Sequence, residues 1–324
     1  MAAMFRALTA ALLVLALGGT APARAEDYPA HPIRVIVPLT PGTTIDILAR
    51  LFSDRLAVKL HQSVIVVNRA GAGGLVAAES VASAPADGYT LLFANSGHAI
   101  LGTLNKNLPF DPVADFKGIG EVAEAPAVVT VSPATGANTL KDFVALAKAK
   151  PGKLTFGSAG IGTATHLSGA YFDLVAGIDM LHVPYKDSTQ LLTDVAAGRV
   201  DAVFAPAAYS MAMVKAGKVK ALAIGAEEPM TEPLQIPTAK SQGVDYVYTT
   251  WYGFLAPAKV PEPILKKLSD AIGEIGQEPA IKAAIARQAI TPHHLGLGEF
   301  DASIKRDMAR LAPLLKTISR QARN

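Results

Sequence analysis

Short apolar, β-branched runs alternate along this chain with longer segments whose apolar residues recur at helical spacing. Arg34 to Leu39 has the pattern of a strand, and apolar residues at helical intervals follow it from Ile45 to Leu60. Such alternation predicts βαβ units, in which helices cover the faces of a parallel sheet. The pattern runs once near the start of the chain and again after residue 128, so we expect an α/β protein with two lobes rather than one long sheet.

The remaining elements follow the same periodicity. The predicted strands are 63–68, 89–95, 128–132, 154–158, 181–185, 201–205, 221–225 and 251–255, and the predicted helices are 75–83, 140–149, 165–175 and 189–197. The proline-containing stretch 226–250 is typical of a connection between bodies. Two further helices are expected, one opened by Pro261 and one over 299–320 with a kink at Pro313.

A chain that builds one lobe, then a second, and then returns must cross between the lobes twice. We place these crossings near 122–128 and 247–254. Lobe 1 then comprises 26–124 and 250–324, and lobe 2 comprises 125–249. Ligands of open α/β sheets bind at the carboxyl ends of strands, where the topology reverses. The cleft between the lobes is therefore the predicted binding site.

The first 25 residues have the features of a signal peptide. Arg6 precedes the apolar run Ala10 to Leu17, which is too short to span a bilayer, and small residues at Ala23 and Ala25 predict cleavage before Glu26. A membrane anchor over 7–19 is the alternative interpretation. We expect a soluble protein exported to the periplasm.

Composition excludes several classes of function. The chain has no cysteine, which rules out disulfides, thiolate zinc sites and a cysteine nucleophile. Its formal net charge is only +3, and no Lys/Arg-rich cluster of a nucleic-acid-binding protein is present. We therefore expect no nucleic-acid partner, and the chain is expected to be a monomer.

The first strand-to-helix turn, 38–46, can bind an anion. Gly42 permits a sharp turn, and Thr43 or Thr44 can cap the helix that follows. Helix N-termini offer unpaired N–H groups and a partial positive charge. Asp46 lies three residues after Thr43, so a capping-box role and a ligand contact are both open.

The second such turn, 157–166, is also rich in glycine and hydroxyl groups. Ser158, Thr163 and Thr165 would line an anion site at the start of the helix. Thr165 stands where a dinucleotide fingerprint needs its third glycine, which disfavours nucleotide binding. His166 is either a helix-face residue or a ligand contact.

Two other segments have both structural and functional interpretations. Asp187 can cap the helix that begins after it, or its carboxylate can line the cleft and accept a hydrogen bond from a ligand ammonium or hydroxyl. The glycine-rich run 69–74 is more typical of a tight turn and helix entry than of a binding loop.

No catalytic or metal-binding motif is present. The sequence lacks Gly-x-Ser-x-Gly and His-Glu-x-x-His. His293 and His294 are adjacent, so on a strand they would point to opposite faces. We predict no catalytic residue, no metal and no cofactor.

The chain resembles the periplasmic receptors of tripartite tricarboxylate transporters, the Bug family. The run Asn68-Arg69-Ala70-Gly71-Ala72-Gly73-Gly74 and the run Asp87-Gly88-Tyr89 are its most specific matches. Other matching stretches are 28–29, 32–38, 41–42, 46, 49–50, 67, 90–92, 111–112, 115–116, 150–154, 183–186, 197–201, 216–223 and 236–238. They occur in order over nearly the whole chain after residue 25.

The resemblance implies a Venus-flytrap fold that closes by hinge motion on a small carboxylated solute. It also implies a membrane permease as partner. Carried over to this chain, the ligand contacts are Gly42, Thr43, Thr44, Asp46, Ser158, Gly160, Gly162, Thr163 and His166, with Tyr185 and Asp187 nearby and Asn95 and Ser96 as additions.

Two positions depart from the family pattern. Thr43 replaces a second glycine and tolerates positive φ poorly, and Asp187 replaces the glycine of Tyr-Lys-Gly. A non-catalytic receptor for a carboxylated solute is the preferred interpretation. An exported α/β enzyme and a sensor for a signalling kinase are the alternatives.

Overall fold

The computed structural model describes residues 28–104, 107–186, 188–230, 234–288 and 290–309. The chain divides into Met1–Ala30 and His31–Asn324, and every helix and strand below belongs to the second unit. The expected signal peptide, Asp187 and the expected kink at Pro313 lie outside the described residues. Within these ranges, no helix combines the length and the apolar character that crossing a membrane requires.

The first strand group follows the order β2-β1-β3-β9-β4, with β10 paired to β4. Strands β2, β1 and β3 are mutually parallel, and β9 and β10 join antiparallel. The bounds of these strands are β1 Ile33–Val37, β2 Val64–Asn68, β3 Thr90–Asn95, β4 Phe116–Val131, β9 Thr249–Pro257 and β10 Thr291–Leu295.

The second strand group follows the order β4-β7-β5-β6, with β8 also paired to β4. β5 lies parallel to β6 and β7, whereas β4 is antiparallel to β7 and β8. The bounds are β5 Thr155–Ser158, β6 Leu181–Pro184, β7 Ala202–Pro206 and β8 Lys220–Ile224. Both parallel-rich sheets predicted from the alternation are therefore present.

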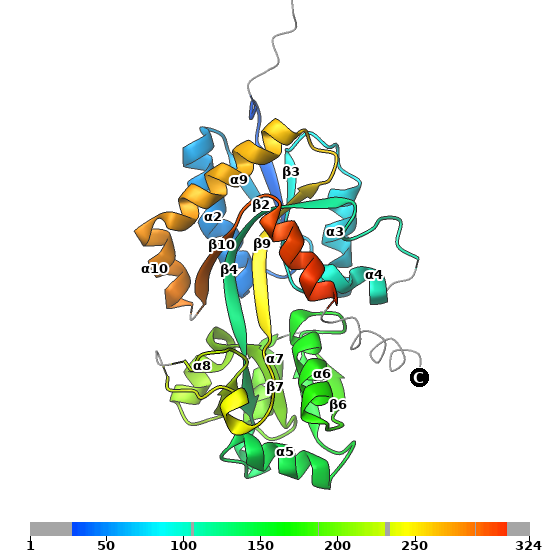
Figure 1. Cartoon of the computed structure of the whole chain (residues 1–324), viewed down its shortest axis with the longest axis vertical. Helices are drawn as coiled ribbons and strands as arrows, with labels where there is room; N and C mark the ends of the chain where they lie inside the picture. The colour runs from blue at the N-terminus through cyan, green and yellow to red at the C-terminus, as the bar shows by residue number, and fades with distance from the viewer. Residues whose placement is uncertain (1–27, 105–106, 187, 231–233, 289, 310–324) are drawn as a thin grey trace, which may run out of the picture. The chain divides into compact units, whose positions relative to one another are not determined.

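Strand β4 belongs to both groups (Figure 1). Its residues 116–126 pair with β9, and its last five residues, from Ala127, pair with β7. The N–H of Ala127 also donates to the carbonyl of Tyr248, 2.9 Å away, just before β9 begins. The pairing partner of β4 thus changes at Ala127, and Tyr248 lies beside this point. The two groups nevertheless form one hydrogen-bonded path, because β4 is 16 residues long rather than the short strand expected at 128–132.

Helices cover both groups. They are α2 Thr44–Leu60, α3 Leu75–Ala82, α4 Leu101–Leu104, α5 Leu140–Ala149, α6 Ala164–Ala176, α7 Ser188–Ala196, α8 Ala207–Lys215, α9 Glu262–Gln277, α10 Pro279–Arg287, the 3-10 turns η1 Ala72–Gly74, η2 His98–Ile100, η3 Pro133–Thr135 and η4 Lys240–Gln242, and the helical residues 299–309. The predicted helices are confirmed over the described residues. The sequence analysis did not predict α8, α10 or β10.

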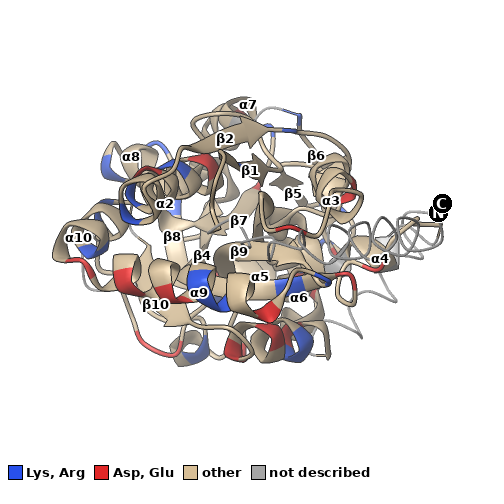
Figure 2. Ribbon diagram, turned by 90° about the horizontal axis from the view of Figure 1, so that it is seen from above, with Lys and Arg blue, Asp and Glu red and all other residues tan. Residues whose placement is uncertain are grey.

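Each group has its own buried core. The first core combines Ile36 and Leu92 with Trp251 and Phe300 from the far end of the chain. The second core runs from Ala127 to Tyr248. On the surface, Lys and Arg are interspersed with Asp and Glu along α9 (Figure 2). Ion pairs between opposite charges are therefore available there, as between Lys266 and Asp270 at 2.7 Å.

Candidate functional site

The first turn, residues 38–46, connects β1 to α2. Gly42 has φ +84, which glycine adopts without strain and which confirms the sharp turn expected there. Thr43 is the N-cap, with φ −74 and ψ 158. Since positive φ is needed at Gly42 and not at Thr43, replacing the family's second glycine by threonine puts no strain on the backbone.

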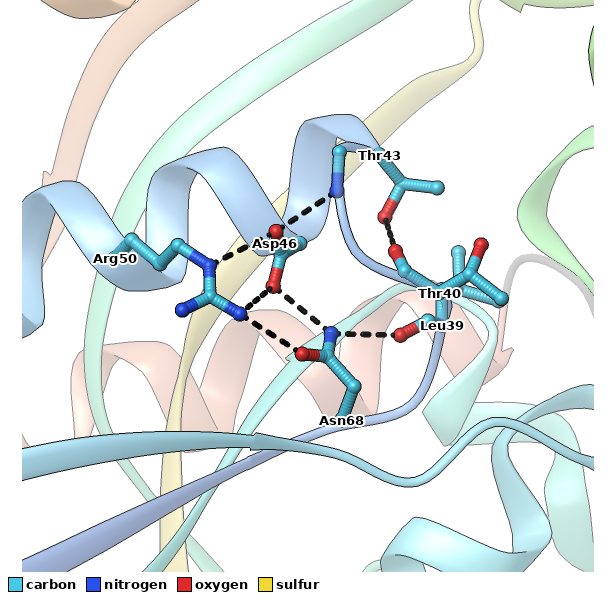
Figure 3. Close-up of polar contacts among 7 residues, drawn as sticks. Leu39, Thr40, Thr43, Asp46, Arg50 and Asn68 are labelled. Carbon is cyan, nitrogen blue, oxygen red and sulfur yellow. Dashed lines mark hydrogen bonds and ion pairs between the residues drawn. The ribbon is translucent and has the colours of Figure 1, made fainter.

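A polar cluster around the buried Asp46 supports this turn (Figure 3). The N–H of Gly42 donates to Asp46 Oδ2 at 2.9 Å, and the Asn68 amide donates to Asp46 Oδ1 at 2.8 Å. Arg50 contacts both carboxylate oxygens, at 3.0 and 2.9 Å. Burial alone would raise the pKa of Asp46, but the hydrogen bonds from Arg50, Gly42 and Asn68 hold it below its ordinary value.

These contacts give Asp46 a structural role that differs from the expected capping box. Its carboxylate reaches the N–H of Gly42 rather than that of Thr43, and the Thr43 hydroxyl donates to the Thr40 carbonyl at 2.8 Å. The Thr43 side chain makes no capping bond. Among the residues that the structure describes, the N–H groups of Thr43, Thr44 and Ile45 have no acceptor. The open donors of the first turn are therefore backbone amides.

The second turn, residues 158–166, connects β5 to α6. Gly160 and Gly162 have φ +116 and +83, so both positions favour glycine. Thr163 is the N-cap, and its hydroxyl accepts from the His166 N–H at 3.4 Å. It also donates to the Gly160 carbonyl at 2.7 Å, which closes the turn.

The other hydroxyls of this turn are likewise bound within it. Thr165 Oγ1 accepts from the Ala159 N–H at 3.0 Å and lies 3.0 Å from Thr163 Oγ1. Ser158 Oγ accepts from the Gly160 N–H at 3.1 Å. The N–H groups of Ala164 and Thr165 donate to no residue in the described part of the chain. As in the first turn, backbone amides remain open while the side chains hold the loop.

Two stacked histidines support the second turn. The rings of His166 and His182 lie 4.0 Å apart, and the Gly162 N–H donates to His166 Nδ1 at 3.2 Å. Burial lowers the pKa of His182 to about 4, and burial together with the neighbouring His182 lowers that of His166 to about 3. Both rings are therefore neutral at pH 7, and neither supplies a positive charge to the turn.

Ser158 and His182 form a pair that the sequence analysis did not foresee, because 24 residues separate them. Ser158 Oγ lies 2.6 Å from His182 Nε2, the arrangement of a nucleophile and its base. Ser158 is 0% exposed, however, and its hydroxyl also bonds to the backbone of Gly160. In this position the pair supports the turn, and a substrate has no access to the oxygen.

The loops after β2 and β3 approach the second turn closely. A methyl group placed on Gly73 would lie 2.8 Å from the carbonyl oxygen of Ile161, and one placed on Gly97 would lie 3.1 Å from that of Gly162. Gly73 also has φ +67. Turn and helix entry therefore describe the glycine-rich segment only in part, since Gly73 and Gly97 also let the two strand groups meet at the second turn.

Asn95 and Ser96, the two further ligand contacts expected at the end of β3, differ in burial and in hydrogen bonding. Ser96 is buried, and its hydroxyl accepts from the Trp251 N–H at 3.0 Å, which ties β3 to β9. Asn95 accepts from the Gly97 N–H through Oδ1 at 3.0 Å, while its amide nitrogen donates to no described residue. Ser96 still has its own O–H to donate, but the residue is only 2% exposed, so Asn95 is the more accessible donor for a ligand.

Tyr185 follows β6, and its N–H donates to the Ser158 carbonyl at 2.9 Å, but its hydroxyl is bound elsewhere. Its hydroxyl donates to Asp194 Oδ2 at 2.7 Å, and Asp194 also pairs with Arg199. Burial and this hydrogen bond raise the pKa of Tyr185 to about 12. Contact with a ligand would have to involve its ring, whereas the predicted role of Asp187 falls on a residue outside the described ranges.

Sequence comparison relates the chain to a known family. The model of the family described as "Tripartite tricarboxylate transporter family receptor" matches residues 48–319. Protein BugT of Bordetella pertussis is 32% identical over 284 residues, which cover 87% of this chain and 87% of BugT.

Solved structures of similar proteins support the same family relationship. The Rhodopseudomonas palustris protein Rpa4515 with adipate has a TM-score of 0.82 at 29% identity, over 90% of this chain and 98% of that one. MatC from the same organism, with bound malate, has a TM-score of 0.80 at 25% identity, over 89% of this chain and 100% of that one. The fold is therefore that of the two-lobed periplasmic solute-binding proteins.

Proposed function

Because the chain belongs to the tripartite tricarboxylate transporter receptor family, we propose that it binds a small carboxylated solute and delivers it to the membrane permease of such a transporter. One observation supports the binding of a carboxylate. Two helix N-termini, at Thr44 and Ala164, present backbone N–H groups without acceptors in the described chain. Such groups, with the helix dipole, bind anions. The adipate and malate of the two Rhodopseudomonas palustris proteins support this chemistry.

Recognition in this proposal rests on neutral donors. Arg50 is bound to Asp46, and His166 and His182 are neutral. The donors left for a carboxylate are the amides of the two turns, with the amide of Asn95 beside them. Amides in fixed positions select for shape and charge together, since they do not reorient to suit a different ligand.

We propose that closure occurs about the two crossings. Lobe 1 would comprise 26–124 and 250–324 and lobe 2 would comprise 125–249, the borders lying beside the change of partner in β4. The tight packing of Gly73 and Gly97 against the second turn is what a closed cleft requires. Small-angle scattering with saturating ligand should give a smaller radius of gyration than the free protein, and an equal radius would refute closure unless the free receptor is already closed.

We further propose that the chain is exported, with cleavage before Glu26, and acts in the periplasm as a monomer. The support is the short apolar run ending in Ala23-Arg24-Ala25, together with the periplasmic binding proteins among its structural neighbours. Terminal sequencing of protein recovered from the periplasm should give Glu26. An intact Met1 on membrane-bound protein would overturn cleavage.

The Asp187 carboxylate bears on the class of ligand. If it faces the cleft, the ligand should carry a hydroxyl or ammonium donor besides its carboxylate, because two negative groups 4 Å apart repel by about 1 kcal/mol even in water. Asp187→Asn keeps the size and much of the capping ability. Unchanged affinity of this variant for the ligand would make Asp187 a helix cap only.

Calorimetric titration tests the main proposal. Adipate, malate and related mono-, di- and tricarboxylates are compared with the matching amides and alcohols. At least one carboxylate should bind at 1:1 while its uncharged analogue does not, and the ligand should be recovered unchanged. Binding of the uncharged analogues alone would refute carboxylate recognition, and chemical conversion of the ligand would favour an exported enzyme.

A further inference from the structure

Two glutamates and one histidine meet where β10 pairs with β4, away from the two turns. His293 Nδ1 lies 3.0 Å from Glu121 Oε1 and 3.5 Å from Glu124 Oε1. One potential ligand atom from each of the three side chains lies within 4.8 Å of the others. Glu121 and His293 are 172 residues apart, so only the antiparallel pairing of β4 with β10 brings them together.

An irregularity in β4 gives the two carboxylates a common direction. Side chains three residues apart in a regular strand point to opposite faces. The register of β4 shifts between Glu121 and Ala123, and that of β10 shifts between Pro292 and Leu295. Such bulges re-aim side chains, and here they allow both Glu121 and Glu124 to reach the same imidazole.

Glu121 is the unusual member of this cluster. Its side chain is 0% exposed, and Oε2 accepts no hydrogen bond from any residue in the described ranges. A buried carboxyl group of this kind is stable either with a proton or with a cation beside it. A solvated acidic patch needs neither.

We propose that Glu121, Glu124 and His293 bind a divalent transition-metal ion, for which Zn²⁺ is the best match. Imidazole nitrogen and carboxylate oxygen are ligands that suit zinc. Bonds of about 2.0–2.1 Å at tetrahedral angles separate two ligand atoms by about 3.3 Å. The distances of 3.0 and 3.5 Å from His293 Nδ1 lie on either side of this value. Three protein ligands leave the fourth position to water.

Such a site would join β10 to β4 a short distance before β4 changes partners at Ala127. A metal that binds only the folded chain stabilises it in proportion to the logarithm of its concentration. We therefore expect Zn²⁺ to raise the melting temperature of the protein. Mg²⁺ should have little effect, because it prefers six oxygen ligands in octahedral geometry.

Zinc titration of the purified chain tests the site. The protein is first freed of metal with a chelator and kept in buffer without carboxylates, which would themselves bind zinc. Calorimetry should give one Zn²⁺ per chain, and His293→Asn and Glu124→Gln should each weaken binding at least tenfold. His61→Asn, at an exposed histidine after α2, is the control and should bind like the parent.

A variant of Glu121 shows whether a loss of zinc binding comes from the missing ligand or from unfolding of the chain. Glu121→Gln resembles the protonated carboxyl group, so it should melt like the metal-free parent and fail to respond to Zn²⁺. The proposal is overturned if the parent binds no zinc at 1:1. It is equally overturned if Glu121→Gln and His293→Asn, both folded, bind zinc as tightly as the parent.

Discussion

The two turns have the same backbone conformation at their N-caps, but different side chains hold them in place. Thr43 and Thr163 are both N-caps, with φ and ψ of −74 and 158 in one turn and −76 and 160 in the other. The first turn is held by the buried carboxylate of Asp46, which pairs with the exposed Arg50 of helix α2. The second is held by its own hydroxyls and by neutral histidines. Open backbone amides at a helix N-terminus can thus be supported by charged or by uncharged neighbours.

Removing the charged support should have the largest effect. Asp46→Ala leaves the Arg50, Asn68 and Gly42 donors without their common acceptor, and we expect the free energy of unfolding to fall by about 3 kcal/mol. Denaturant titration measures this loss. Asp54→Ala, at an exposed carboxylate of the same helix, is the matched control and should change little. A loss no greater than that of the control would show that the cluster does not hold the first turn.

Blocking the second turn should weaken binding next most strongly. Gly160→Val places a branched side chain at φ +116, where the turn exposes its amides, and we expect at least a tenfold loss of affinity, about 1.4 kcal/mol. Gly217→Val imposes a similar backbone strain at φ +67, away from both turns. Calorimetry with the carboxylate that binds the parent compares the two. Equal affinities in folded proteins would place the anion site elsewhere.

The paired caps allow a direct comparison. Thr163→Ala removes the bonds to His166 and Gly160, and should cost about 1 kcal/mol of stability. Thr43→Ala removes only an exposed bond to Thr40 and should cost a few tenths. Denaturant midpoints at constant slope measure both. If both variants lost the same unfolding free energy, the additional hydrogen bonds of Thr163 would contribute nothing to stability.

The two turns should also differ in pH response, an effect that is absent at neutral pH and develops only as the pH falls. The pKa of His182 is lower in the folded chain, about 4, than the usual value of about 6.5, so its contribution to stability is complete above pH 6.5 and is lost as the pH falls toward 4. The pKa of Asp46 is also lowered, but from an ordinary value near 3.9, so its contribution is lost only at lower pH. Between pH 7 and 5.5 only the second turn should weaken.

Substituting His182 isolates this response from that of the other titrating groups. His182→Gln should flatten the decline in unfolding free energy between pH 7 and 5.5 by about 1 kcal/mol. Asp46→Asn should leave the decline over this range as it is in the parent. Parallel curves for parent and His182→Gln would mean that His182 is already charged, or equally exposed, in the folded protein.

Local signals explain what the sequence predicts well. Helix α5 has the predicted bounds 140–149, because the Thr139–Asp142 capping box and apolar spacing both act within a few residues. The part of β4 that pairs with β9, residues 116–126, by contrast contains Gly118, Gly120 and Pro126 and has no strand-like alternation. Its pairing with β9, a distant segment, makes it a strand, so the sequence analysis found only its last residues.

The candidate site likewise combines features that local sequence predicts with contacts between distant segments. The glycine and threonine positions of both turns follow from rules for strand–helix connections, and they are where the sequence placed them. Three contacts depend on segments far apart in the chain: Gly73 with Ile161, Ser158 with His182 and Glu121 with His293. No local pattern encodes such contacts, because they arise from how the strand groups pack. The ligand-contact role of each residue remains a prediction.

The sharing of β4 sets an order of assembly as the chain is made. The second core uses residues between Ala127 and Tyr248, one uninterrupted stretch. The first core needs Ile36 and Leu92 together with Trp251 and Phe300. A chain emerging from its amino end therefore begins the first core earlier and completes it later. Until Phe300 has emerged, the early strands therefore expose apolar surface. The second core, whose residues emerge later, is complete before the first.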